Sequence, residues 1–498
     1  MNVNPITRLD YPDPDVIRVE DTYYMVSTTM HFMPGCEILQ SFDLVHWEHV
    51  TYVYETLDHT DAQQLKSGQN IYGQGMWAAS LRYHEGRFYI CFVANDTRKT
   101  YLYTSEKIDG PWKKQLIEGF YHDGSLLFDE DGRNYIVYGN DEIWITELNE
   151  DLTAPKKDGL HRLLVSDHKN PKLGYEGSHI QKINGYYYIF LIHSLRDHWM
   201  RTEACFYSDS LEGEFTGGDV LCDDRGYCGQ GVAQGGIVDT PDGKWYAMLF
   251  QDSGAVGRIP ILLPVTWKDH FPVFGQNGHV PEEIEVHSTR PGYIYQPLVG
   301  SDDFCNGLLP RWQFNHDPDP QYYHLDALQG TYTITTREVC TELTQAVNTL
   351  TQRMSYPSCA AEVTVDASAL KEGDVAGLCA LQSCYAAVGI TKHHGKYEVL
   401  MLDKKEDGIL DMTEGTVVES HQMDFRLEAD FCNMKDEARC YYRVNKGDWL
   451  PIGTVHKLYF KLDHFTGCRF GLFCYAAEET GGSACFRDFK YYDVDEIS

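Results

Sequence analysis

The chain has 498 residues, more than one hydrophobic core comfortably supports, so two domains are expected. Tyrosine (34 residues) and glycine (43 residues) are abundant, which favours an all-β protein with many turns. The formal net charge of -32 argues against nucleic acid and anionic membranes as partners, because phosphate binding requires clustered lysine and arginine, and it favours a neutral ligand.

The sequence also carries information on cellular location. It has no run of about 20 apolar residues, so no membrane-spanning helix is predicted. The first residues lack the basic and apolar parts of a secretory signal. The fifteen cysteines are odd in number and form no Cys-x-x-Cys pair. We therefore expect reduced thiols and a cytoplasmic protein, although a secreted chain already trimmed of its signal would have the same sequence.

Residues 1–287 repeat one unit of supersecondary structure five times. Each unit contains a strand, a tight turn and a returning strand rich in aromatic residues, and further strands follow. The fourth turn, Asn184-Gly185, favours a two-residue hairpin because both residues tolerate positive φ. Four strands per unit and a period of roughly 50 residues predict a five-bladed β-propeller, whose innermost strands line one channel.

A distinctive side chain stands about eight positions before each of the five turns. Equivalent positions in the blades face the same mouth of the channel, so these side chains are expected to converge. In chain order they are Asp13, Trp77, Asp123, Glu176 and Gln234.

Asp13 lies between two prolines that fix its backbone. On the residues alone, Asp15 is an equal candidate for a functional carboxylate. Trp77 either offers a flat face to a sugar ring or packs between blades. Arg258 stands among apolar residues after the fifth turn and needs a carboxylate partner, from the protein or from a substrate.

The pattern changes after the propeller. Residues 288–300 are rich in turn-forming residues and predict a linker. From 301 to 498, longer alternating strands predict a β-sandwich of the jelly-roll, concanavalin-like kind. His393-His394 lies in a probable turn without companion ligands, so no metal site is predicted there.

Three carboxyl groups in one pocket, those of Asp13, Asp123 and Glu176, cannot all remain ionised, because like charges raise one another's pKa. Such a pocket supplies one protonated acid and one ionised base, the pair that hydrolysis of a glycosidic bond requires. Calcium is the competing use of clustered carboxylates, but it takes six or more oxygen ligands and this set is smaller.

Several motifs carry a resemblance to a known family: Tyr-Pro-Asp13-Pro, His-Asp123-Gly-Ser, Tyr-Glu176-Gly-Ser-His and Gly-Arg258. They resemble glycoside hydrolase family 43, which contains β-xylosidases and α-L-arabinofuranosidases on a five-bladed propeller. The resemblance continues past the linker, where Asp302-Asp303-Phe304 is similar to the start of the family's sandwich domain.

By this resemblance Asp13 is the general base that activates water and Glu176 is the general acid. Asp123 is the residue that raises the pKa of the acid and holds it in place. The family inverts the anomeric configuration, which implies that the base and acid carboxyl groups lie roughly 6.5–9.5 Å apart, with room for a water molecule.

The resemblance also implies sugar contacts. Trp77 and Arg258 match positions that contact the sugar. Gln234 stands where many relatives have a channel histidine, and Met30 stands beside the pocket wall where relatives often have phenylalanine. Apart from the resemblance, the aromatic residues Tyr322, Tyr323 and Phe465 of the sandwich are candidates for completing the pocket from the domain interface, and nothing local selects one of them.

The implied function is that of an exo-acting inverting glycosidase. It releases terminal xylose or arabinofuranose from hemicellulose-derived oligosaccharides, and the preference between the two sugars is left open. No cofactor is expected; a channel calcium ion and a homo-oligomer stay open. The alternatives are a carbohydrate-binding propeller without catalysis and a retaining fructan- or sucrose-cleaving hydrolase, whose N-terminal motif differs from Tyr11-Pro12-Asp13-Pro14.

Overall fold

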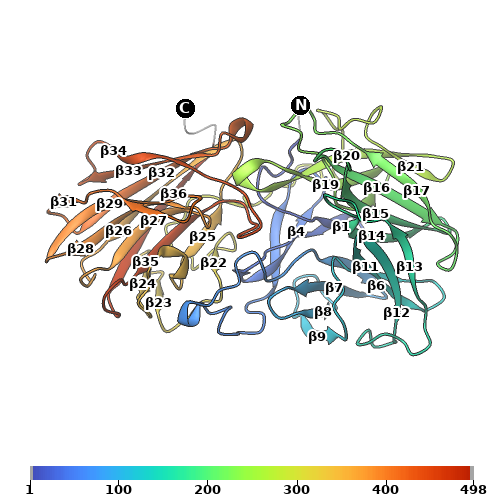
Figure 1. Cartoon of the computed structure of the whole chain (residues 1–498), viewed down its shortest axis with the longest axis horizontal. Coiled ribbons are helices and arrows are strands. Elements are labelled where there is room, and N and C mark those ends of the chain that lie inside the picture. Colours follow the sequence, from blue (N-terminus) through green and yellow to red (C-terminus); the bar gives the residue numbers. More distant parts are fainter. Residues whose placement is uncertain (1–3, 494–498) are drawn as a thin grey trace.

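The computed structural model describes residues 4–493 and places a ring of five sheets beside a two-sheet sandwich (Figure 1). In the ring, each blade is a four-stranded antiparallel sheet. The first blade contains β1 (Asp15–Val19), β2 (Thr22–Val26), β4 (Gly35–Ser41) and β5 (Glu48–Tyr54), and the second contains β6 (Ser80–His84), β7 (Arg87–Ala94), β8 (Lys99–Ser105) and β9 (Lys113–Ile117). The third contains β10 (Ser125–Phe128), β11 (Asn134–Asn140), β12 (Glu142–Leu148) and β13 (His161–Ser166). The fourth contains β14 (Glu176–Ile183), β15 (Tyr186–Ser194), β16 (Arg201–Ser208) and β17 (Thr216–Leu221), and the fifth β18 (Ile237–Asp239), β19 (Trp245–Asp252), β20 (Arg258–Lys268) and β21 (Phe271–Phe274).

The turn chemistry that predicted the blades is visible in the fourth one. Ile183 at the end of β14 pairs with Tyr186 at the start of β15, so the turn has two residues. Asn184 and Gly185 both have positive φ, 51° and 86°, as this class of tight hairpin requires. The predicted five-bladed propeller is confirmed.

The ring closes between its first and last blades. Arg18 of β1 donates from Nε to the carbonyl oxygen and to Oδ1 of Asp239 in β18, at 3.1 and 3.2 Å. In the segment that precedes β1, the amide of Tyr11 donates to the carbonyl of Arg258 in β20 at 3.1 Å. The N-terminal segment thus fixes the fifth blade against the first.

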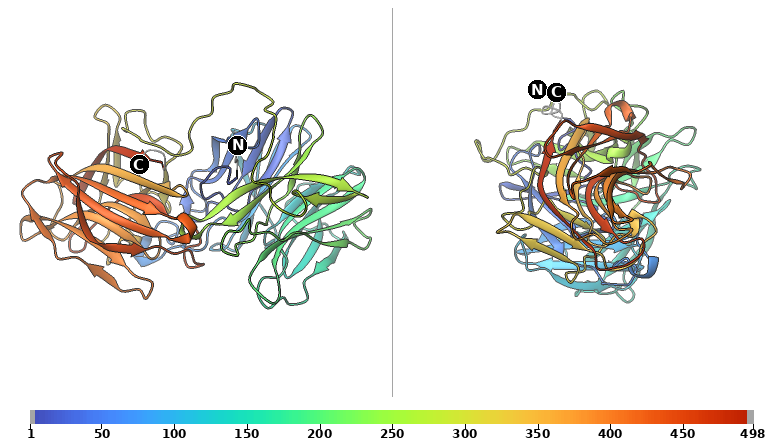
Figure 2. Two further views of the ribbon diagram at one scale, coloured as in Figure 1. Left: turned by 90° about the horizontal axis from the view of Figure 1, so that it is seen from above. Right: turned by 90° about the vertical axis from the view of Figure 1, so that its left-hand side faces the viewer.

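The second domain is a sandwich of two antiparallel sheets (Figure 2, left). Its first sheet contains β3 (Phe32–Met33), β22 (Gln313–Asn315), β25 (Leu350–Arg353), β35 (Arg469–Tyr475), β27 (Val375–Leu381), β28 (Ala386–His393), β29 (Lys396–Lys404), β30 (Leu410–Met412) and β31 (Thr416–Val418). Its second sheet contains β23 (Tyr323–Asp326), β24 (Thr331–Thr335), β36 (Ser483–Tyr492), β26 (Ser358–Asp366), β32 (Gln422–Asp430), β33 (Glu437–Val444) and β34 (Leu450–Lys457). Apolar residues that alternate along these strands, such as Val363, Leu378 and Phe425, are fully or almost fully buried in one core.

The two domains share one sheet. β3 belongs to the propeller part of the chain, yet it pairs with β22 of the sandwich through Met33↔Phe314 and Phe32↔Asn315. Nearby, Arg353 of the sandwich forms a buried ion pair with Glu37 of β4, Nη1 to Oε2, at 2.8 Å. Burial alone would raise the pKa of Glu37, but Arg353 and His49 hold it down to about 2.

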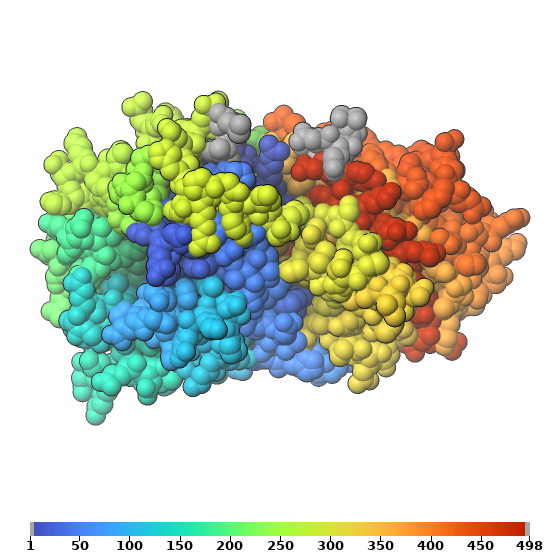
Figure 3. Space-filling model, turned by 180° about the vertical axis from the view of Figure 1, so that it is seen from behind, coloured from blue at the N-terminus to red at the C-terminus, as the bar shows by residue number. Residues whose placement is uncertain are grey.

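Residues 288–300 lie against the first blade. Thr289 donates its amide to the carbonyl of Phe42 at 2.8 Å, and the ring of Tyr293 meets the Phe42 ring edge-on at 4.6 Å. Figure 3 shows this yellow-green segment lying across the blue start of the chain. The predicted linker therefore follows a fixed path over the propeller.

In the described part of the chain, the remaining regular elements are four short 3-10 helices, η1 (Lys66–Gly68), η2 (Gly254–Val256), η3 (Leu343–Gln345) and η4 (Cys432–Met434). Within residues 4–493, the structure contains no helix with the length and apolarity needed to cross a membrane. All fifteen cysteines lie in this range, and their thiols are free.

Candidate active site

The predicted side chains gather at one mouth of the channel because each stands at or just before the start of an innermost strand. Asp13 precedes β1, Trp77 precedes β6, Asp123 precedes β10, Glu176 begins β14 and Gln234 precedes β18. The innermost strand is the first strand of every blade, so all five run in the same direction along the channel. Side chains far apart in the sequence therefore meet.

Asp13 is held from two sides. Arg258 donates from Nη1 to Asp13 Oδ1 at 3.0 Å, and the hydroxyl of Thr28 donates to Asp13 Oδ2 at 2.6 Å. The backbone of Asp13 has φ of 53°, a left-handed conformation that is unusual outside glycine. Asp13 is 6% exposed, so its position is fixed before any ligand arrives.

The alternative carboxylate, Asp15, links the first blade to the second and fourth blades. It accepts hydrogen bonds from the amide of Leu81 at 2.7 Å and from Arg82 Nη1 at 2.8 Å, and its Oδ1 lies 3.1 Å from His179 Nδ1. Burial opposes ionisation of Asp15, but Arg82 and His179 outweigh it and lower the pKa. Asp15 is also the more deeply buried of the two carboxylates, at 1% exposed against 6% for Asp13.

Glu176 and Asp123 are linked through a bulge in β14. The register between β14 and β15 shifts between Glu176 and His179, where Gly177 has φ of 65°. The bulge turns the amide of Gly177 toward Asp123, and it donates to Oδ2 at 3.0 Å. Gln234 fills the space above this glycine: a Cβ at position 177 would lie 2.7 Å from Gln234 Cγ.

Two polar residues that the sequence analysis did not single out complete the group around Glu176. His122 Nε2 lies 3.4 Å from Glu176 Oε2 and 3.5 Å from Asp123 Oδ2. Asn140, at the end of β11, donates from Nδ2 to Glu176 Oε2 at 2.7 Å. The position of His122 directly before Asp123 is a signal that could have identified it, whereas nothing local marks Asn140.

The electrostatics of this group are set by burial and close charges. Burial raises the pKa of Asp123; His122 counteracts this, Glu176 and Asp13 add to it, and the pKa reaches about 6. Burial lowers the pKa of His122, but Asp123 and Glu176 raise it to about 9. The site therefore combines three carboxyl groups with two cations, Arg258 and His122.

A metal ion is a poor fit for these residues. His122, Asp123 and Glu176 offer ligand atoms within 4.8 Å of one another, the only such group found among residues 4–493. Asp123 and Glu176 raise the pKa of His122 to about 9, so an ion bound there would have to displace the proton of the imidazolium. The two carboxylates alone fall short of the oxygen ligands that calcium takes.

Aromatic rings form the wall beside the carboxylates, and one comes from the sandwich. Phe465 covers the guanidinium of Arg258, with Cζ 4.2 Å from the ring centroid. Its ring also lies 5.5 Å from that of Trp77, which in turn lies 6.1 Å from His122. Of the three sandwich aromatics considered from the sequence, Phe465 is the one in contact with these side chains.

Gln234 and Met30 take supporting positions. The backbone amide of Gln234 donates to Glu203 Oε2 at 2.7 Å, and burial raises the pKa of Glu203 well above its usual range. Met30 is 2% exposed, and its amide and carbonyl both bond to Met76, directly before Trp77. The Met30 backbone therefore positions the segment that carries Trp77, while its side chain is buried.

Both domains of the chain match models of known protein families. The model for glycosyl hydrolases family 43 matches residues 3–272, and the model for a beta xylosidase C-terminal concanavalin A-like domain matches residues 301–492. A beta-xylosidase of Formosa agariphila is 26% identical over 99% of this chain and 89% of its own length. A non-reducing end alpha-L-arabinofuranosidase of Bacteroides ovatus is 24% identical over 82% of this chain and 79% of its own length.

Solved structures of GH43 proteins have the same fold as this chain. A bifunctional GH43-CE protein of Bacteroides eggerthii is 42% identical, with a TM-score of 0.92 over 98% of this chain; the chain spans only 63% of that protein. An engineered GH43 enzyme that displays both endo-xylanase and exo-arabinofuranosidase activity is 27% identical, with a TM-score of 0.86 over 99% of both chains. Because the catalytic-domain model covers more than half of the residues, the chain belongs to glycosyl hydrolases family 43.

Proposed function

We propose that this protein is an exo-acting glycosidase that removes a terminal xylose or arabinofuranose from hemicellulose-derived oligosaccharides. Enzymes of its family are inverting hydrolases, and relatives along almost its whole length are named beta-xylosidase and xylosidase/arabinosidase. The observation that carries the proposal is the meeting of Asp13, Asp123 and Glu176 at one channel mouth, beside a wall of Trp77 and Phe465.

In the proposed mechanism Glu176 protonates the glycosidic oxygen while Asp13 takes a proton from the water that attacks the anomeric carbon on the opposite face. Arg258 and Thr28 hold the two oxygens of Asp13, which fixes the direction of proton abstraction. Asp123 accepts from the amide of Gly177 and so holds the backbone next to Glu176.

Substrates with poor and with good leaving groups distinguish the role of the acid from that of the base. Glu176→Gln removes the proton donor, so hydrolysis of xylobiose should fall by about 10²- to 10⁴-fold. Aryl glycosides with good leaving groups need less protonation and should lose less. Asp13→Asn should be inactive on both substrates, because attack of water then lacks its base. Wild-type rates on xylobiose with Glu176→Gln would disprove the acid assignment.

The preference between xylose and arabinofuranose is measured by the ratio of two kcat/KM values. We would compare kcat/KM on 4-nitrophenyl β-D-xylopyranoside with that on 4-nitrophenyl α-L-arabinofuranoside, and identify the product anomer by NMR at early times. Turnover of either substrate with inversion supports the proposal. No turnover of either, together with measurable binding of xylo-oligosaccharides, would support a carbohydrate-binding propeller instead.

A further inference from the structure

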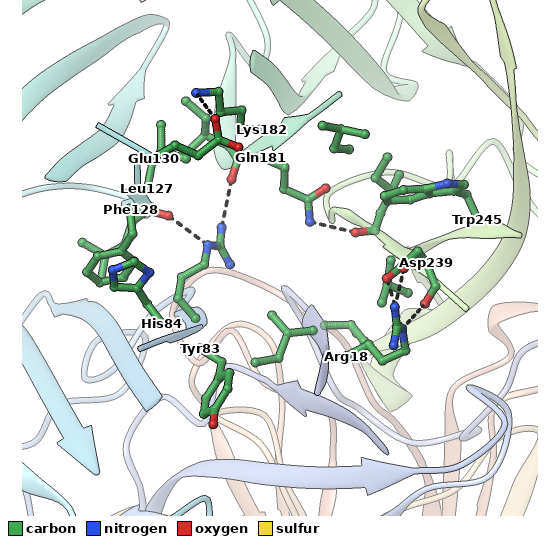
Figure 4. A pocket seen from close by; sticks show the side chains of 18 residues that line it. Arg18, Tyr83, His84, Leu127, Phe128, Glu130, Gln181, Lys182, Asp239 and Trp245 are labelled. Atoms are coloured by element: carbon green, nitrogen blue, oxygen red, sulfur yellow. Dashed lines mark hydrogen bonds and ion pairs between the residues drawn. The ribbon is translucent and has the colours of Figure 1, made fainter. Parts of the chain in front are cut away.

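The channel has a second mouth, opposite the carboxylates, and it opens into a cavity of about 450 Å³ (Figure 4). The cavity is lined by the far ends of the same innermost strands, including Arg18 of β1, His84 of β6, Phe128 of β10 and Lys182 of β14. Its volume lies within the range that is usual for small-molecule sites, roughly 300–1,000 Å³.

Arg82 closes the channel between the two mouths. Its guanidinium donates to the carbonyls of Leu126, Leu81 and Ile180, to Ser125 Oγ and to Asp15 Oδ2, at 2.6 to 3.3 Å. These partners lie on four of the five innermost strands. The cavity therefore has a rigid polar floor and is separate from the catalytic mouth.

The walls of the cavity present flat rings. The His84 ring stacks on Phe128 with centroids 4.6 Å apart and planes 8° apart. Trp245 lies on the opposite side of the view from this pair (Figure 4), and Tyr83 is 45% exposed at the rim. Rings that are partly exposed around a polar floor suit a ligand with both apolar faces and hydroxyl groups.

The charged groups in the cavity occur as pairs. Arg18 binds Asp239, and Lys182 Nζ lies 2.6 Å from Asp129 Oδ1 and 3.2 Å from Glu130 Oε2. A charged ligand would have to compete with these internal partners. A neutral sugar would avoid that cost, because a hydroxyl group is able to donate to a carboxylate and accept from a cation without separating the ion pair.

We propose that this cavity is a second saccharide-binding site, which holds a neutral pentose chain without cleaving it. The choice of a pentose rests on the proposed function of the catalytic mouth, whereas the existence of the site rests on the cavity alone. A chain with both sites would stay attached to a branched oligosaccharide while its catalytic mouth trims free ends.

Calorimetric titration of the full chain with xylotetraose tests this site. Glu176→Gln serves as the background, to suppress hydrolysis. We expect two binding events per chain. Adding Trp245→Ala or Tyr83→Ala should weaken one event by about tenfold or more. The control is Trp144→Ala, which should preserve both events, because Trp144 is a partly buried tryptophan stacked on His161 outside the cavity.

The variants also separate this site from the catalytic one. Trp245 packs against Trp267, so its variant is checked for folding by thermal unfolding, and the exposed Tyr83→Ala gives an independent reading. In the Glu176-containing enzyme, both changes should leave kcat/KM on the aryl xyloside unaltered. A single event in the Glu176→Gln background, or a second event unaffected by both changes, would overturn the inference. Binding that depends on Trp245 in a chain that hydrolyses no pentoside would instead refute the proposed function and leave this site standing.

Discussion

At the scale of single residues, the unusual feature is a cationic histidine beside the proposed acid. His122 lies within 3.5 Å of both Asp123 and Glu176, and these neighbours raise its pKa to about 9. A positive charge favours the ionised form of a nearby carboxyl group, and the proton donor must stay protonated to act. His122→Gln should therefore shift the basic limb of the kcat/KM profile upward by about one pH unit.

The profile is measured on xylobiose, whose leaving group needs the general acid, between pH 4 and 10, with His84→Gln as the matched control. His84 is partly exposed at the opposite mouth of the channel, so its variant should keep the wild-type profile. If the basic limb of His122→Gln stayed in place or moved downward, His122 would not set the protonation of the acid.

Residue identities were predictable where a position in the repeat defined them. The spacing before each turn led to Asp13, Asp123 and Glu176, and the structure brings Asp123 and Glu176 together through Gly177 and His122. The choice between Asp13 and Asp15 was not accessible from spacing, because both flank the start of β1. It depends on partners from other blades, such as Arg82, that only the folded ring brings near.

At the scale of elements, one loop of the sandwich reaches the mouth of the propeller. It carries Phe465, whose ring covers the Arg258 guanidinium at 4.2 Å. Phe465→Ala should lower kcat/KM on the aryl xyloside on the order of 10- to 100-fold, because Arg258 loses its cover and the sugar loses an apolar contact. Leu462→Ala in the same loop is the control, since Leu462 is 71% exposed. Equal losses in the two variants would mean that the loop acts only through stability.

Elements were predictable to the extent that local turn chemistry specifies them. Asn184-Gly185 specified a two-residue hairpin, and the blade around it followed. No local signal marked β3, which has two residues and leaves the propeller to pair with β22. Likewise, nothing near Phe465 indicated a contact with Trp77, because that contact depends on how the domains meet.

At the scale of the whole molecule, the domain interface buries ionisable groups that sequence composition could not locate. The Glu37–Arg353 pair joins the propeller to the sandwich, with each side chain at most 3% exposed. Removing one partner of such a pair leaves an unpaired buried charge, which is strongly destabilising. The interface is therefore built to hold one arrangement of the two domains, and this arrangement places Phe465 at the catalytic mouth.

Three histidines at the same interface make a specific prediction about acid stability. His31 of the propeller lies 4.8 Å from His316 and 5.0 Å from His464 of the sandwich, measured between ring centroids. Burial lowers the pKa of all three, that of His464 to about 3, and the nearby Arg469 adds to the effect on His31 and His464. These rings stay neutral in the folded protein but take up protons when it unfolds below the usual histidine pKa of 6.5.

Folding stability should therefore fall as the pH drops below 6.5. At pH 5.5 each histidine that stays neutral lowers the free energy of unfolding by about 1.4 kcal/mol, and the three together lower it by about 4 kcal/mol. His31→Phe removes one of these protonation sites and keeps an aromatic ring in place, so its free energy of unfolding should fall by about 1.4 kcal/mol less than that of the wild type between pH 7.5 and 5.5. Urea unfolding at the two pH values measures this, with His393→Phe as the control, because His393 is exposed at the end of β28 in the sandwich. Identical pH dependence of His31→Phe and the wild type would show that the interface histidines are not the acid-sensitive groups.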